Sequence, residues 1–134
     1  MARRGSTTSS SNRFGTLDST HSDQSQMDDY ESPYFLDNGD HPTVSLVSHH
    51  LTGGNYNTWN RVMSMALNAK NKLGFVDGII SCPCATDLLF GTWSLCNSMV
   101  ISWILNVVSK EIADNLLYID TIVEVWRDLH DRFH

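Results

Sequence analysis

The chain has few basic side chains for its length. Its 134 residues include 9 Lys or Arg against 15 Asp or Glu, which gives a formal net charge of −6 at pH 7. Three of the cations, Arg3, Arg4 and Arg13, lie near the N-terminus, and the other six are spread over residues 41–134. Proteins that bind nucleic acid draw most of their affinity from clustered Lys and Arg. We therefore expect no direct binding of DNA or RNA by this chain.

Disulfide-forming cysteines, long apolar runs and a secretory leader are also missing. The three cysteines are an odd number, so they do not make a disulfide framework, and reduced thiols are expected. The longest apolar stretch, residues 99–108, is interrupted by Ser102 and Asn106 and is half of the roughly 20 residues that a membrane span needs. The N-terminus has no apolar segment of the kind that opens a secretory signal. These absences predict a protein of the cytoplasm or nucleus that is neither secreted nor bound to a membrane.

Residue types that carry chemistry are present but are not arranged as a site. Cys82 and Cys84 offer two thiolates to a metal, but a structural zinc site needs a second pair of ligands. Nothing in the sequence places one of the six histidines beside a thiol as a base. Gly53-Gly54 lacks the spacing of a phosphate-binding loop. The sequence therefore predicts no catalytic residue, no metal ligand and no cofactor, and we expect a protein without enzymatic activity.

The composition changes near residue 30. Residues 1–29 hold eleven Ser or Thr and only five apolar side chains, too few to offset the entropy of ordering the chain. This segment is predicted to be a disordered arm. Residues 30–134 contain all four tryptophans and are long enough for one modest core. They are expected to form a single helical domain, and the end of the chain within a helical pattern predicts a domain truncated at its C-terminus.

Hydrophobic periodicity predicts two long helices in the second part of the chain. Residues 56–72 form the first helix, with Asn55 as its N-cap and Gly74 as its stop. Residues 92–108 form a helix that is apolar on nearly all sides, a pattern typical of a central helix packed on several sides. Ahead of both, residues 43–47 favour an extended segment.

Capping residues predict two further helices. Ser109 is expected to cap a short helix, and Thr121 with Glu124 forms a capping box at the start of the last one. Asp128 and Arg132 make a favourable pair one turn apart on its exposed side. The predicted fold class is all-α: a small bundle of about four helices, preceded by an extended segment and the disordered arm.

The apolar stripes of these helices define the expected core. Large aromatic side chains dominate core energetics, so packing is favoured over a ligand-binding cage for the four tryptophans. Exposed residues on such stripes would instead indicate contacts with partner helices. The predicted structural core comprises Trp59, Met63, Leu67, Phe75, Trp93, Val100, Trp103, Ile104, Ile122, Trp126, Leu129 and Phe133.

Several ordered blocks of residues make the chain similar to a known family. From about residue 33 to residue 134 it resembles the N-terminal, capsid-like region of gag polyproteins from copia-type LTR retrotransposons of plants. The blocks are YFL at 34–36, LTGxNYxxW at 51–59, ALxAKNKLGFVDG at 66–78, WxxCNxMVxxWILN at 93–106 and WxDLxxRF at 126–133.

The resemblance implies a structural protein. Gag chains assemble into a shell around the RNA of their element, and their capsid regions are helical. The enzymes of such elements, and the zinc knuckle that binds RNA, lie in later parts of the polyprotein. We therefore expect a non-enzymatic assembly domain that self-associates with other gag-like chains through helical surfaces. The alternative is a domesticated or relic gag-like module that binds another protein without building a shell.

Overall fold

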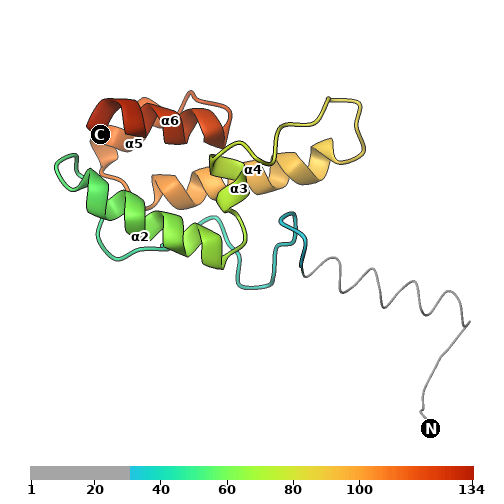
Figure 1. The fold of residues 1–134 in the computed structure, drawn as a ribbon, viewed down its shortest axis with the longest axis horizontal. Helices are drawn as coiled ribbons and strands as arrows, with labels where there is room; N and C mark the ends of the chain where they lie inside the picture. Colours follow the sequence, from blue (N-terminus) through green and yellow to red (C-terminus); the bar gives the residue numbers. More distant parts are fainter. Residues whose placement is uncertain (1–30) are drawn as a thin grey trace, which may run out of the picture. The chain divides into compact units, whose positions relative to one another are not determined.

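The computed structural model describes residues 31–134, and the chain divides after Phe35 into two units, Met1–Phe35 and Leu36–His134. The disordered arm predicted for residues 1–29 lies outside the described residues. The second unit contains five α-helices and no strand, which confirms the predicted all-α class for the described part of the chain (Figure 1). The helices are α2 (Tyr56–Ala69), α3 (Leu73–Val76), α4 (Phe90–Leu105), α5 (Lys110–Leu116) and α6 (Ile122–Phe133).

The helices of the second unit pack around α4 and α6. In Figure 1, α4 runs between α2 and α6, and α5 connects the end of α4 to the start of α6. α6 packs against both α3 and α4, and α2 packs against α3. None of the described helices is long and apolar enough to cross a membrane.

α2 ends at Ala69, three residues before the predicted end of the first helix. Asn71 adopts the left-handed conformation with φ of 59°. Its backbone N–H donates to the carbonyl of Asn68 at 3.0 Å, and the next N–H, that of Lys72, donates to Leu67 at 2.8 Å. This pair of hydrogen bonds is a Schellman motif, which satisfies the last carbonyls of the helix. Asn71, and not a glycine, therefore stops the helix.

Gly74 was expected to stop the first helix, and this expectation is wrong. It lies inside the short helix α3, where Phe75 and Val76 turn back into the core. A Cβ at Gly74 would lie 2.8 Å from the Cδ1 atom of Ile80. A side chain at this position would therefore push the end of the Ile80 side chain aside.

The predicted extended segment is part of an irregular stretch, residues 37–50, which we call the lead-in. Hydrogen bonds from the end of α4 hold it in place. The indole N–H of Trp103 donates to the carbonyl of His41 at 2.8 Å. The amide of Asn106 donates to the carbonyls of Pro42 at 2.6 Å and Val44 at 3.1 Å. These hydrogen bonds satisfy backbone groups that would otherwise pair within a sheet.

A single parallel bridge between Leu51 and Val108 follows the lead-in. The N–H of Leu51 donates to Val107 at 2.8 Å, and the N–H of Ser109 donates to Leu51 at 2.8 Å. α4 ends at Leu105, three residues before its predicted end, because residues 106–108 turn into this bridge.

The two predicted caps at the end of the chain are present. The hydroxyl of Ser109 accepts a hydrogen bond from Ile112 at the start of α5. That of Thr121 accepts from the N–H of Glu124 at 3.4 Å and donates to its carboxylate at 2.9 Å. Asn55 also precedes its helix as expected, but its side chain makes no hydrogen bond to α2. Asn55 is therefore the N-cap residue as predicted, but its side chain bonds the preceding turn instead of the helix.

Ten of the twelve predicted core residues are buried, and Trp126 and Phe133 are half-buried. Periodicity did not find several residues that the structure also buries, because they lie in the loops or at the ends of helices. These are Val47, Leu51, Lys72, Val76 and Val108.

Candidate functional site

The three cysteines differ in their exposure to solvent. Cys82 and Cys84 are exposed on the loop between α3 and α4, and Cys96 is buried in α4. Burial raises the pKa of the Cys96 thiol, which disfavours the thiolate that would act as a nucleophile or ligand. Among residues 31–134, no group of three or more His, Cys, Asp or Glu side chains is placed to hold a metal ion.

The tryptophans do not share one ligand-binding cage. The indole N–H of Trp59 donates to the carbonyl of Val107 at 3.0 Å, and that of Trp103 is bonded to the lead-in. The rings of Trp59 and Trp126 lie 5.7 Å apart, where α2 faces α6. The buried Nε1 atom of Trp93 has no hydrogen-bond partner among residues 31–134. The indoles therefore act mainly as packing groups and backbone donors.

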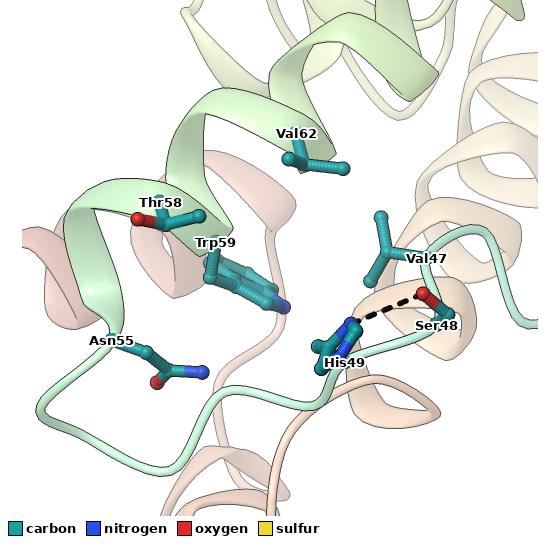
Figure 2. Close-up of a pocket in the computed structure, with 7 residues that line it drawn as sticks. All are labelled: Val47, Ser48, His49, Asn55, Thr58, Trp59 and Val62. Atoms are coloured by element: carbon teal, nitrogen blue, oxygen red, sulfur yellow. Dashed lines mark hydrogen bonds between the residues drawn. The ribbon is translucent and has the colours of Figure 1, made fainter.

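A small pocket lies between α2 and the lead-in (Figure 2). Its volume is about 160 Å³. Val47 and Val62 face each other across it, and the ring of Trp59 forms part of its wall. On the lead-in, the hydroxyl of Ser48 hydrogen-bonds the Nδ1 atom of His49 at 3.2 Å. The remaining lining residues are Asn55 and Thr58. A mainly apolar pocket of this size suits one apolar side chain of a partner and is small for a cofactor.

A second, wider pocket lies along the exposed side of α6. It has a volume of about 510 Å³ and is lined mainly by polar and charged side chains. Four of them are carboxylates, and Asp128 already pairs with Arg132 at 2.9 Å. The lining residues are Tyr118, Ile119, Asp120, Glu124, Arg127, Asp128 and Asp131. The negative charge of this surface makes it a poor site for a phosphate or nucleic acid.

Several large apolar side chains remain on the surface. They are Val62, Met65, Ile79, Leu88, Leu89, Leu95, Leu117 and Tyr118. Exposed apolar residues that occur singly are normal, so only a contiguous group points to an interaction. On α2, Val62 lines the pocket at Trp59, and Met65 lies about one turn further along the helix.

The exposed side of α4 differs from that of the other long helices. None of its 16 residues is charged, including those that face outward. The central helix was expected to be packed on several sides, but Leu95 is 67% exposed. By contrast, the exposed side of α6 carries Glu124, Arg127 and Asp131. These features define an exposed, uncharged and partly apolar surface on a small helical domain.

Comparison with known protein families finds a match in the first half of this domain. Residues 37–84 match the family model described as the gag polypeptide of LTR copia-type elements. This part of the chain is therefore similar to copia-type gag polypeptides, and the resemblance seen in the sequence is confirmed there. The match runs from the lead-in to the loop before α4, and the sequence blocks in α4 and α6 lie beyond it. No curated protein and no solved structure matches the chain.

Proposed function

We propose that this chain is a structural, non-enzymatic module that self-associates with other copies through helical surfaces. Its copia-type gag segment supports a gag-like structural role, because that family is structural and non-catalytic. The observation that carries self-association is the apolar, uncharged surface that the described chain leaves exposed on α4. An acidic chain keeps such a surface at a cost in solubility unless another protein covers it.

Sedimentation of the full 134-residue chain over a range of protein concentrations tests this proposal. We expect the mass to grow with concentration. Raising the salt concentration should strengthen association, because it screens the repulsion between copies that each carry a net charge of −6. A compact monomer at every protein and salt concentration would show that the chain does not assemble alone. RNA added at low salt should leave the sedimentation unchanged.

The second candidate function is capture of another protein, and the pocket at Trp59 is the observation that favours it. Val47, Val62 and Trp59 offer an apolar recess beside polar groups, which suits an apolar side chain of a bound peptide. Recovery of a stable heteromeric complex from a chain that never self-associates would favour this function. Replacing Val62 with Lys should then abolish the complex, whereas Arg61→Lys on the neighbouring exposed position should not.

A further inference from the structure

One face of α4 is left uncovered by the rest of the described chain. Leu95 lies four residues after Gly91, and Ser98 and Met99 lie three and four residues after Leu95, so these residues lie along the same side of the helix. Leu88, just before the helix, is fully exposed. The opposite side of α4 packs into the core through residues such as Trp93, Val100 and Trp103. We call the outward residues 88–99 on this side the α4 face.

We propose that the α4 face binds the same face of a second copy in an antiparallel, two-fold arrangement centred near Leu95. The inference rests on the proposed function of self-association and names the surface that carries it. A two-fold interface uses one patch twice, so the patch must be complementary to itself. The α4 face meets this requirement because its side chains are apolar or small and none of them is charged.

Charge favours a second copy as the occupant of this face. The chain has a net charge of −6, so most of its surface repels another copy. On α6, for example, two copies would bring Glu124 and Asp131 close to their equivalents. Two copies can approach through the α4 face without opposing like charges.

The glycine at position 91 gives a second, independent reason to place another copy against the α4 face. It has no positive φ, and a Cβ added to it would meet nothing within 4 Å. Neither backbone conformation nor packing in the described chain therefore requires glycine, although glycine lowers helix stability relative to alanine. A gap at this position is useful if a side chain from outside enters it. With the two-fold axis near Leu95, Gly91 of one copy lies opposite Met99 of the other, because both positions are four residues from the axis.

Sedimentation equilibrium of full-length variants tests the location of the interface. Leu95→Lys should raise the dissociation constant roughly a hundredfold, because each copy would bury an unpaired charge near the axis. Met65→Lys on α2 is the matched control, since Met65 is 60% exposed and Leu95 67%. It should leave association unchanged.

The outcomes separate this inference from the proposed function. If the parent chain associates and Leu95→Lys associates equally well, the α4 face is wrong and self-association stands. If the parent chain is a monomer throughout, both are wrong, and another protein or residues 1–30 would be left to cover the face. A circular dichroism melt of dilute Leu95→Lys shows whether the variant is folded. If it is not, Leu95→Gln replaces it, with the same expected direction.

Gly91→Ala tests the position of the axis without adding charge. In dilute solution it should raise the Tm, because alanine favours the helix and its Cβ meets open space. It should nevertheless weaken association roughly tenfold, because the methyl group fills the gap that Met99 of the second copy would occupy. Unchanged or stronger association of Gly91→Ala would overturn this register.

A cross-linking experiment gives a positive signal for the same arrangement. In a chain with Cys82→Ser and Cys84→Ser, the variant Leu95→Cys should oxidise to a disulfide-linked dimer, because equivalent residues meet at the axis. Met65→Cys in the same background should remain monomeric after oxidation. Equal cross-linking of the two variants would contradict a specific contact at Leu95.

Discussion

The side chain of Asn97 in α4 accepts a hydrogen bond from the backbone N–H of Ile122, the first residue of α6, at 2.9 Å. Its amide also donates to the carbonyl of Asp120 at 2.9 Å. The N–H groups of the first helical turn have no partner within their own helix. One buried amide therefore satisfies backbone groups on both sides of the entry into α6 and fixes that helix on α4.

Replacing Asn97 with Leu should destabilise the fold strongly. The side chains have similar size, but leucine would leave the N–H of Ile122 buried without its partner and would remove the donor to the carbonyl of Asp120. We expect the free energy of unfolding to fall by about 3 kcal/mol. Urea denaturation followed by tryptophan fluorescence measures the change. Asn68→Leu, at an exposed position of α2, is the control and should stay within about 0.5 kcal/mol of the parent.

The tryptophans at positions 93 and 103 should respond differently to replacement by phenylalanine. Trp103→Phe removes the donor to His41 and releases the lead-in, at a cost of about 1–3 kcal/mol beyond the loss of ring volume. Trp93→Phe removes a buried N–H that has no partner, so it carries no such additional cost. Thermal and urea unfolding of both variants should therefore rank Trp103→Phe as less stable. The opposite order would contradict the hydrogen-bond assignment.

How much of this fold the sequence predicts depends on how far apart in the sequence the interacting residues lie. Ser109 and Thr121 were recognisable as caps because each bonds a residue three positions away. The amphipathic stripes of α2 and α6 were recognisable for the same reason, since their period is local. Trp103 and His41, by contrast, are separated by 62 positions, and nothing in a hydrophobic pattern pairs a particular indole with a particular carbonyl.

The exposed surfaces were harder to predict than the core. An apolar pattern on every side of α4 does not say which side the rest of the chain covers, and only the packing of α6 and the lead-in decides it. The pocket at Trp59 was not predicted, because it combines α2 with Val47 and His49 from an irregular segment. Trp126 and Phe133 lie on the stripe of α6 but near its border, so they are only partly covered.

The ion pair between Asp40 and Lys70 should make stability depend on pH. Burial alone raises the pKa of Asp40, but its hydrogen bonds from Lys70 at 2.7 Å and from the N–H of Asp37 bring it below its usual value. A carboxyl group whose pKa is lower in the folded state stabilises the fold above its unfolded pKa of about 3.9. This contribution is lost as the pH falls through the folded pKa.

Lys70→Met should consequently cost more stability at pH 7 than at pH 3. At pH 7 it leaves the carboxylate of Asp40 buried without its cation, and we expect a loss of about 2 kcal/mol. As the pH falls through the lowered pKa of Asp40, its carboxyl group becomes protonated and the difference from the parent should shrink. Thermal melts across this range measure it. Lys110→Met is the control, because its pair with Asp114 is exposed and should contribute little at either pH.

Thiol labelling should separate the three cysteines into two classes. Cys82 and Cys84 are exposed and should react rapidly with a disulfide reagent in the native chain. Cys96 should react slowly, because it is buried and burial raises its pKa above the ordinary thiol value. Its rate should rise to that of the other two in denaturant. Rapid labelling of three thiols in the folded chain would contradict the packing of α4.

The helix stop at Asn71 gives a local test of the fold. Its φ of 59° lies in the left-handed region, where a Cβ clashes with the following carbonyl unless the side chain compensates by hydrogen bonding. Asn71→Ala should therefore lower the free energy of unfolding by about 1 kcal/mol. Asn71→Gly is the matched variant, because glycine adopts this conformation without the steric cost and supports the same Schellman hydrogen bonds. It should be clearly more stable than Asn71→Ala in urea unfolding. Equal stability of the two variants would mean that α2 continues through Asn71, as the hydrophobic pattern alone suggests.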